Sequence, residues 1–300
     1  MAFKSGFVTI IGRPNVGKST LLNLLTGEKI AIMSSKPQTT RHAIRTIVTT
    51  ENYQMVFVDT PGIHKPKNKL GEFMNQEALG TLTDVDVILY LVDANDKSIG
   101  PGDANIIETL KQTEVPVLLI INKIDMIEKQ LLLPLIAQYS QAFDFEEIIP
   151  VSALKAETKD LVLQAIEKRL PEGEKYYPDD MLTDQQERVL AQELIREKLL
   201  HLLSDEVPHG VGIEVIRFKE VPQKKIIEID ANIYCEKESH KGIIIGKEGA
   251  MLKKVGTYAR EDMERLFGSK VFLKLWVKVK DDWRNNDFML NELGYKRSSE

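Results

Sequence analysis

The sequence has few of the features that would place it in a membrane or outside the cell. Its 300 residues contain a single cysteine, Cys235, so no disulfide can form within the chain, and the composition suits a reducing compartment. No apolar run approaches the roughly 20 residues that a membrane-spanning helix needs. The first apolar run, residues 7–11, is too short for a secretory signal. We therefore expect a cytoplasmic protein with a buried, structural Cys235.

The charge of the chain is small but unevenly distributed. The net charge is −5, yet residues 241–280 contain ten Lys or Arg against four acids, so this segment carries +6 and the remainder −11. A basic segment on an acidic protein indicates a polyanionic partner, although a solvated helix face would give the same pattern. With 43% hydrophobic residues and no low-complexity tract, a packed core in each of one or two domains is expected.

In the first part of the chain, strand-like and helix-like stretches alternate. Apolar, β-branched runs occur at residues 7–12, 43–50, 54–59, 85–92, 115–121 and 148–151. Helical stretches fall near residues 19–26, 103–113, 127–140 and 157–170. This order predicts an α/β, doubly wound sheet with mostly parallel strands, in which ligands bind at the carboxyl ends of the strands.

A Pro- and Tyr-rich stretch predicts a linker at residues 173–184, between a first domain at 1–172 and a second at 185–300. The second domain has a helix–strand–strand–helix–helix–strand order, with a Gly-x-x-Gly turn between its two central helices. Its elements are expected near residues 186–203, 210–218, 225–234, on either side of 246–249, and at 271–279. This is the order of an α+β KH domain of type II, which binds single-stranded RNA.

Two motifs predict a guanine-nucleotide site. Gly12-Arg13-Pro14-Asn15-Val16-Gly17-Lys18-Ser19 matches the P-loop pattern G-x-x-x-x-G-K-[ST] in full. Asn122-Lys123-Ile124-Asp125 follows a later strand, and its carboxylate can accept two hydrogen bonds from the ring N–H and amine of guanine. Adenine offers neither, so binding it would leave Asp125 unpaired. Each motif follows a predicted strand, which is the context that a P-loop GTPase domain requires.

The same motifs assign roles around the phosphates. Lys18 is expected to reach the β- and γ-phosphates and Ser19 to ligate Mg²⁺. Asp59, in Asp59-Thr60-Pro61-Gly62, should hold Mg²⁺ through water, while the Gly62 N–H contacts the γ-phosphate. A threonine in the polar stretch 30–42 should ligate Mg²⁺ only while a γ-phosphate is bound, which makes this stretch a switch. The residues alone leave Thr39 and Thr40 both open.

One position departs from the Ras-like pattern. After Gly62, where such enzymes have a glutamine that orients the attacking water, this chain has Ile63, followed by His64 as an expected solvated loop residue. Isoleucine cannot polarise water. Hydrolysis is therefore expected to be slow, or to depend on another cation or a partner.

The Gly-x-x-Gly turn predicts the RNA-binding site. Glycine lets the backbone approach the sugar-phosphate chain closely. The apolar run 243–245, with Ile229 and Ile233, is expected to form a floor for the bases. The predicted RNA-binding residues are the turn, its flanking lysines and this run: Lys241, Gly242, Ile243, Ile244, Ile245, Gly246, Lys247, Glu248, Gly249, Lys253 and Lys254.

Together with Gln38-Thr39-Thr40-Arg41-His42 and residues 59–66, 208–211, 242–253 and 276–280, these motifs closely resemble the Era family. This is a TrmE-Era-EngA-like family of bacterial GTPases related to translation factors, and it acts in assembly of the small ribosomal subunit. The resemblance spans nearly the whole chain. It implies Thr40 as the Mg²⁺ ligand, Ile63 as the family pattern, and K⁺ bound by Asn15 in place of an arginine finger. It also implies a guanine contact from the backbone of Ser152-Ala153.

The resemblance implies GTP or GDP, Mg²⁺ and K⁺ as ligands. The expected partners are single-stranded 16S ribosomal RNA near its 3′ end and the 30S subunit, and the chain is expected to be a monomer. The resemblance also implies peripheral contact with the cytoplasmic face of the cell membrane, although no amphipathic anchor distinct from the core helices is found in the sequence.

The expected catalytic residues are Lys18, Thr40, Gly62 and Asn15, and the expected metal ligands are Ser19, Thr40 and Asp59. The expected nucleotide contacts are Gly12, Arg13, Pro14, Asn15, Val16, Gly17, Lys18, Ser19, Thr20, Asp59, Thr60, Pro61, Gly62, Ile63, Asn122, Lys123, Ile124, Asp125, Ser152 and Ala153.

Three interpretations of function stay open. The first is a GTPase whose nucleotide state gates RNA binding. The second is an RNA-binding scaffold that holds GTP without significant turnover. The third is a GTPase acting in RNA modification, for which the sequence supplies no metal cluster and no nucleophilic Cys/His arrangement.

Overall fold

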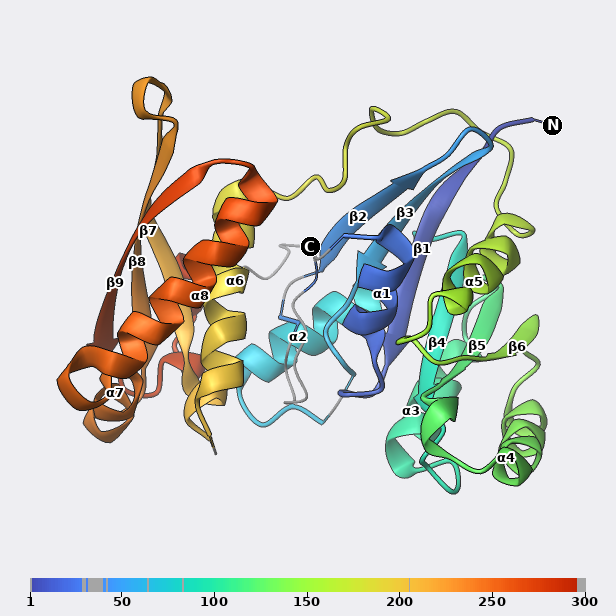
Figure 1. Cartoon of the computed structure of the whole chain (residues 1–300). Coiled ribbons are helices and arrows are strands. Elements are labelled where there is room, and N and C mark those ends of the chain that lie inside the picture. The colour runs from blue at the N-terminus through green and yellow to red at the C-terminus, as the bar shows by residue number, and fades with distance from the viewer. Residues whose placement is uncertain are drawn as a thin grey trace. The chain divides into compact units, whose positions relative to one another are not determined.

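The computed structural model describes residues 2–28, 31, 40–41, 43–63, 65–82, 84–204 and 206–295. The chain divides into two units, one reaching to Asp184 and the other beginning at Gln185, with residues 66–73 grouped with the second. Each unit has its own sheet (Figure 1).

The first unit is built on a six-stranded sheet with the order β2-β3-β1-β4-β5-β6. All neighbouring strands are parallel except β2, which pairs antiparallel with β3. The strands are β1 (Lys4–Gly12), β2 (Ile44–Thr49), β3 (Tyr53–Asp59), β4 (Val87–Asp93), β5 (Val117–Asn122) and β6 (Glu147–Pro150). The helices are α1 (Lys18–Thr26), α3 (Pro101–Leu110), α4 (Lys129–Ala142) and α5 (Glu157–Glu167), together with α2 (Lys69–Gly80), which belongs to this unit from Met74 onward. The doubly wound α/β sheet predicted from the sequence is confirmed.

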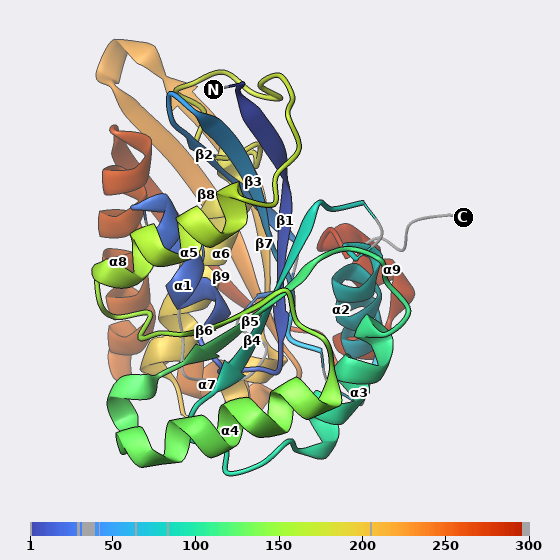
Figure 2. The same cartoon turned by 90° about the vertical axis from the view of Figure 1, so that its right-hand side faces the viewer.

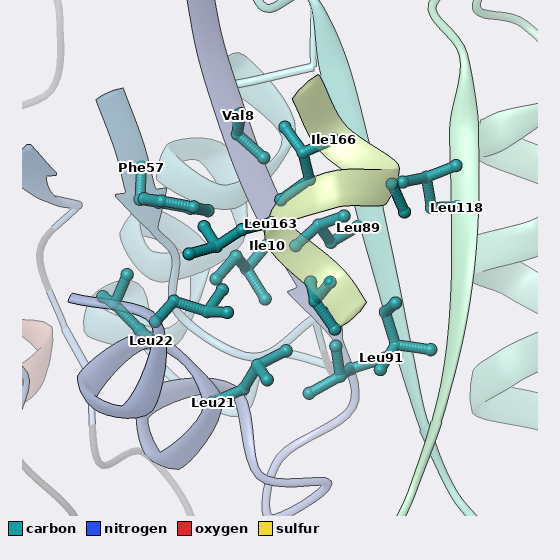
Figure 3. Packing of buried hydrophobic residues seen from close by; sticks show 14 of the residues in the cluster. Val8, Ile10, Leu21, Leu22, Phe57, Leu89, Leu91, Leu118, Leu163 and Ile166 are labelled. Carbon is teal, nitrogen blue, oxygen red and sulfur yellow. The ribbon is translucent and has the colours of Figure 1, made fainter. Parts of the chain in front are cut away.

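Helices cover both faces of this sheet (Figure 2). On one face, α1 and α5 pack on the sheet through a cluster in which Leu21, Phe57, Leu89 and Ile166 are fully buried (Figure 3). On the other face, α3 and α4 pack through a second cluster of buried side chains. Because both faces are covered, the central strands are nearly continuous apolar runs, which is why the sequence revealed them.

The second unit is a three-stranded sheet with the order β7-β8-β9. Strands β7 and β8 are antiparallel, whereas β8 and β9 are parallel and are joined through α7 and α8. The elements are α6 (Glu187–Leu202), β7 (Gly212–Val221), β8 (Ile226–Cys235), α7 (Glu238–Ile245), α8 (Ala250–Phe267), β9 (Lys270–Val279) and α9 (Asp287–Glu292). Helices α6, α7 and α8 share one core with a single face of the sheet. This is the α+β fold of a type II KH domain, as predicted.

Short 3₁₀ turns complete the chain: η1 (Ile124–Met126), η2 (Val207–Gly210), η3 (Pro222–Lys224), η4 (Lys247–Gly249) and η5 (Trp283–Asn285). Cys235 is fully buried, and burial raises the pKa of its thiol to about 11. The expectation of a structural thiol is therefore confirmed.

Two helices were not predicted from the sequence, α2 and α9. Helix α2 contains two glycines, which lower its intrinsic helix propensity. Its Leu70, Met74 and Ala78, spaced four residues apart, are fully buried, so packing stabilises it instead.

Gln54 binds the segment that follows the first domain. Its side chain is fully buried at the start of β3. The carbonyl oxygen accepts hydrogen bonds from the N–H groups of Tyr176 (2.7 Å) and Tyr177 (2.9 Å). The amide nitrogen donates to the Tyr177 carbonyl (2.8 Å) and to the Thr49 hydroxyl (3.0 Å). One glutamine thereby satisfies two backbone donors and one backbone acceptor of the segment.

The same segment continues along the edge strand β2. The Ile47 N–H donates to the Leu182 carbonyl (2.9 Å), and the Thr183 hydroxyl donates to the Arg45 carbonyl (2.6 Å). The Arg45 guanidinium forms an ion pair with Asp184 at 3.1 Å. Residues 176–184 are thus hydrogen-bonded to the first unit and cover the open edge of its sheet.

Replacing Gln54→Ala should loosen this attachment. The change leaves the backbone N–H groups of Tyr176 and Tyr177 without their acceptor, at a cost of about 1–3 kcal/mol for each group that stays buried. We expect a lower Tm for the first unit and faster proteolytic cleavage within residues 173–184. Gln112→Ala, at an exposed turn position, is the matched control. Unchanged Tm and unchanged cleavage would mean that Gln54 does not hold the segment.

Candidate functional site

The phosphate loop lies between β1 and α1, at the carboxyl end of the sheet. Gly17 precedes α1 with φ of 104°, and a Cβ there would lie 2.2 Å from the Asn122 amide nitrogen. Only glycine combines this backbone conformation with so close an approach. The loop backbone can therefore lie directly against the loop that follows β5.

The side chain of Lys18 is fixed by hydrogen bonds to the backbone of the phosphate loop. Its ammonium group donates to the carbonyls of Gly12 (3.1 Å) and Arg13 (3.0 Å), and the residue is 7% exposed. Burial lowers the pKa of Lys18 to about 8, and the charge of Asp59 opposes this shift. A phosphate group in the loop would bring a further negative charge into direct contact with this buried cation.

Three predicted metal ligands meet at one point. The Ser19 hydroxyl lies 3.2 Å from the Thr40 hydroxyl and donates to an Asp59 carboxylate oxygen at 3.2 Å. The Thr40 hydroxyl donates to the same oxygen at 3.0 Å. All three ligands are hard oxygen donors, the kind that Mg²⁺ prefers. The donor set therefore fits Mg²⁺ bound beside the phosphate loop.

The base motif is tied to the phosphate loop through two side chains. The Asn122 amide donates to the Val16 carbonyl (2.8 Å), and its oxygen accepts from the Ala153 N–H (2.9 Å). Lys123 donates to the Asn15 carbonyl (2.8 Å) and to Asp93 (2.5 Å). Three loops that follow β1, β5 and β6 are thereby connected into one surface.

Asp125 is left available on that surface. It lies in η1 with an exposed side chain, and its carboxylate has no hydrogen-bond partner among the residues that the structure describes. Nearby, Ser152 and Ala153 are buried, and the Thr158 hydroxyl fixes the loop by donating to the Ser152 carbonyl at 2.7 Å. Asp125 is thus free to accept from a guanine base.

Sequence reasoning missed the residues that anchor Arg13. The Arg13 Nε lies 2.8 Å from a carboxylate oxygen of Asp103, a fully buried residue in the first turn of α3, and the guanidinium also pairs with Asp96. The Tyr90 hydroxyl donates to Asp103 at 2.9 Å. Burial disfavours the charge on Arg13, but Asp103 and Asp96 outweigh it and raise the Arg13 pKa. These partners lie about 80 to 90 positions away, so local sequence gave no signal.

The Lys123 anchor was also missed. Burial disfavours the charged form of Asp93, but hydrogen bonds from Lys123 and Asn95 outweigh this effect and lower the Asp93 pKa. Asp93 is the last residue of β4, so its position at a strand end was the available signal.

Part of the predicted switch lies outside the described residues. Residues 29–30, 32–39, 42 and 64 are not described, so Thr39 and His64 have no structural account. Thr40 is described, and it is the threonine that meets Ser19 and Asp59. Ile63 contributes its N–H to the Gly12 carbonyl at 3.3 Å, which places the Gly62 loop beside the phosphate loop.

A groove lies between α8 and β9 in the second unit. It has a volume of about 430 Å³ and begins at the Gly-x-x-Gly turn. Its lining residues are Gly249, Leu252, Lys253, Gly256, Thr257, Arg260, Val271, Phe272, Leu273 and Leu275. One face of α8 carries Lys253, Gly256 and Arg260, which are three and four positions apart. This helical spacing could have predicted from the sequence that these residues line one surface.

The turn itself has the predicted character. Gly246 has φ of 72°, and a Cβ there would lie 2.7 Å from the Met251 Cβ. Gly249 also has a positive φ, of 79°, and directly precedes the first residue of α8. Lys247 and Glu248 are exposed between them. The backbone of this turn is therefore accessible to a sugar-phosphate chain.

The predicted apolar floor is wrong in part. Ile229 and Ile233 are fully buried in the core between the sheet and the helices, as is Ile244 from the predicted RNA-binding run. Their side chains cannot reach a base, because the helices cover that face of β8. The apolar side chains that line the groove come from α8 and β9 instead: Leu252, Val271, Phe272, Leu273 and Leu275.

Comparison with known proteins agrees with this architecture. Residues 7–123 match a family model described as 50S ribosome-binding GTPase, and residues 206–284 match a KH domain model. GTPase Era from Ruminiclostridium cellulolyticum is 59% identical over 99% of both chains. GTPase Era from Alkaliphilus metalliredigens is 56% identical over 99% of this chain and 100% of its own length.

Two solved structures are also similar over the whole chain. One is Era in complex with MgGDPNP and nucleotides 1506–1542 of 16S ribosomal RNA, with a TM-score of 0.93 and 41% identity over 98% of this chain and 99% of that one. The other is a variant of Aquifex aeolicus Era bound to GDP·AlF₄⁻, with a TM-score of 0.93 and 40% identity over the same shares.

The fold and the two sites define a P-loop GTPase joined to a type II KH domain. At this identity and coverage, the chain belongs to the Era family of GTPases. None of the helices in the described part of the chain is long and apolar enough to cross a membrane.

Asp125→Asn should change the base preference. An amide donates where the carboxylate accepted, so guanine loses its partners and xanthine gains one. We expect GTP affinity to fall by as much as about 10⁴-fold, the range for a site whose hydrogen-bond partners are removed, while XTP binding appears. Asp144→Asn removes one exposed acid outside the motif and should change neither affinity. Equal affinities for GTP and ATP in the unmodified chain would contradict the assignment.

Proposed function

We propose that this chain is a GTP-hydrolysing switch that binds single-stranded 16S ribosomal RNA near its 3′ end and acts in assembly of the 30S subunit. One observation carries the proposal: a guanine-nucleotide site and a basic KH groove occur in one chain. Its relative of known structure, similar over the full length, is bound to MgGDPNP and a 16S RNA segment. A cytoplasmic location belongs to the same proposal, whereas membrane contact rests on the family resemblance alone.

In the proposed GTP complex, Ser19, Thr40 and Asp59 would hold Mg²⁺. Bound Mg²⁺ would neutralise charge on the β- and γ-phosphates. Lys18 exchanges its two carbonyl partners for phosphate oxygens, and the Gly62 N–H contacts the γ-phosphate. Asp125 and the Ser152–Ala153 backbone bind guanine. The meeting of Ser19, Thr40 and Asp59 supports this arrangement.

Thr40 links the nucleotide to the rest of the chain. It lies shortly before β2, and β2 is hydrogen-bonded to residues 182 and 183, which directly precede the second unit. We infer that loss of the γ-phosphate releases Thr40 and, through β2, alters the segment that leads to the KH domain. This continuity is a route by which nucleotide state can change RNA affinity.

Slow hydrolysis follows from the side chains near the γ-phosphate position. Ile63 packs against the apolar cluster around α3 and α4 and offers no group to orient water. Asn15 has φ of 68°, an exposed side chain, and no partner for its side-chain amide among the described residues. Its oxygen is available to hold K⁺, which would then supply the positive charge that an arginine finger supplies elsewhere.

Turnover should therefore depend on K⁺. We expect an intrinsic rate of about 10⁻³ s⁻¹ or below, typical of unassisted GTPases, with a higher rate in KCl than in NaCl at equal ionic strength. Asn15→Ala should abolish that difference, measured as phosphate release. Asn105→Ala, an exposed asparagine on α3, should preserve it. A rate in the unmodified chain that is the same in both salts would remove K⁺ from the mechanism.

The KH groove should carry the RNA binding, and the glycines of its turn give the test. Gly249→Asp adds a side chain and a negative charge where the backbone faces phosphate, so RNA affinity should fall by at least about tenfold. Gly246→Asp should act similarly but also clash with Met251. Lys247→Ala should weaken binding less and reduce the log–log salt slope by about 0.7, the value for one phosphate contact on a single strand.

Gly268→Asp is the matched control for these variants. Gly268 has φ of 63° and open space around its Cβ position, like Gly249, but it lies at the other end of α8. The control should share the backbone strain of Gly249→Asp and bind RNA normally. Equal binding by Gly249→Asp and Gly268→Asp would place the RNA site elsewhere.

A further inference from the structure

The outward face of β9 carries a row of alternating aromatic and basic side chains. Phe272, Lys274, Trp276 and Lys278 lie at every second position, and we call these four residues the β9 strip. The ring-bearing residues are 51% (Phe272) and 43% (Trp276) exposed. The residues between them pack on the opposite face, in the core with the helices: Val271, Leu273, Leu275 and Val277.

Protection of an edge strand explains only half of this pattern. Strand β9 is the edge of its sheet, and lysines on an edge strand discourage pairing with another chain. Phe272 and Trp276 have no such role. Two large rings kept half in water, on one face of one strand, are typical of a contact surface.

The strip keeps its positive charge despite acids on the neighbouring strand. Glu228 and Asp230 lie opposite Phe272 and Lys274 in the β8–β9 register. Arg217 from β7 pairs with both, at 2.5 Å and 4.0 Å. Within the described ranges, neither Lys274 nor Lys278 forms an ion pair; Lys274 instead lies over the Phe272 ring, 5.2 Å from its centroid. A polyanion is therefore the partner that fits the charge of the strip.

The strip is continuous with the KH groove. Phe272 belongs to the strip and also lines the groove between α8 and β9. Helix α8 runs antiparallel to β9, since Gly256 lies by Leu275 and Glu264 by Val271. An RNA strand that follows the groove from the Gly-x-x-Gly turn therefore reaches Phe272 at the far end, and on rounding the open edge of β9 there it would meet Lys274, Trp276 and Lys278 on the outward face. Because β-strand residues are about 3.3 Å apart, the two rings lie about 13 Å apart along β9, with one lysine between them.

We propose that the β9 strip is a second nucleotide-binding surface for single-stranded RNA that continues out of the KH groove. Bases stack on Phe272 and Trp276, and Lys274 and Lys278 contact the phosphates between and beyond them. Aromatic rings on a sheet face bind bases in this way, without sequence preference, in other RNA-binding folds. The inference rests on the proposed RNA binding of the KH domain and extends it by a separate surface.

Tryptophan fluorescence can report on the strip directly. The chain has two tryptophans, Trp276 and Trp283. Trp283 is fully buried, and its indole N–H donates to the Gly210 carbonyl at 2.9 Å. We expect a single-stranded RNA of about twelve nucleotides to quench the emission of Trp276. An RNA of about four nucleotides, the length that a KH groove clamps, should bind without quenching. In Trp276→Phe, the remaining emission should not respond to either RNA.

Affinity measured by anisotropy with the same two RNAs completes the test. Trp276→Ala and Phe272→Ala should each weaken binding of the longer RNA by about 5- to 150-fold, the range for losing one stacked base. Trp276→Phe should retain most of the affinity because it keeps a ring. Phe288→Ala, which removes a ring that is 68% exposed in α9, is the control and should bind like the unmodified chain.

The outcomes separate this inference from the proposed function. If the unmodified chain binds neither RNA, the proposed RNA binding itself fails. If it binds both, but Trp276 is not quenched and the alanine variants bind normally, the strip is not an RNA surface. Equal losses for the short and the long RNA would assign these rings to the groove alone. A dimer in sedimentation that Trp276→Ala abolishes would assign the strip to a second copy of the chain.

Discussion

The amide of Asn122 is the constraint on which the nucleotide site depends. It donates to the phosphate loop at Val16 and accepts from Ala153, so a single side chain sets the distance between the loops that follow β1, β5 and β6. Gly17 must be glycine because this amide occupies the place of its Cβ. The proposed base-binding and phosphate-binding loops are therefore joined into one hydrogen-bonded unit, which carries Lys18, Ser19 and Asp125.

Much of this site could be predicted from the sequence because it depends on local pattern. Central strands of a parallel sheet are buried on both faces, so they are readable as apolar runs, and ligand-binding residues follow them directly. Asp59 ends β3, Asn122 ends β5, and Ser152 follows β6. The Gly-x-x-Gly turn could also be predicted from a local pattern. Its two glycines have positive φ, which few other residues adopt, and they lie between two helices.

The remainder depends on contacts between distant residues or on packing. Gln54 holds Tyr176 and Tyr177 across more than 120 positions, and Asp103 anchors Arg13 across 90. No local pattern marks either partner. Helix α2 forms by burying Leu70 and Met74 despite its glycines. Ile229 and Ile233 were placed on the wrong face because apolar character does not say whether a strand faces a helix or a ligand.

The central claim of this account is that the nucleotide state of the first domain sets the RNA affinity of the second. The most direct test is to titrate the full-length chain with a 3′-terminal segment of 16S RNA, in the presence of GDPNP and then of GDP. We expect the affinities to differ by about 5- to 150-fold, which corresponds to a coupling of about 1–3 kcal/mol. By linkage, the same RNA must change the ratio of GDPNP to GDP affinity by the same factor. Identical RNA affinities in both nucleotide states would contradict the switch and leave two domains that merely share a chain.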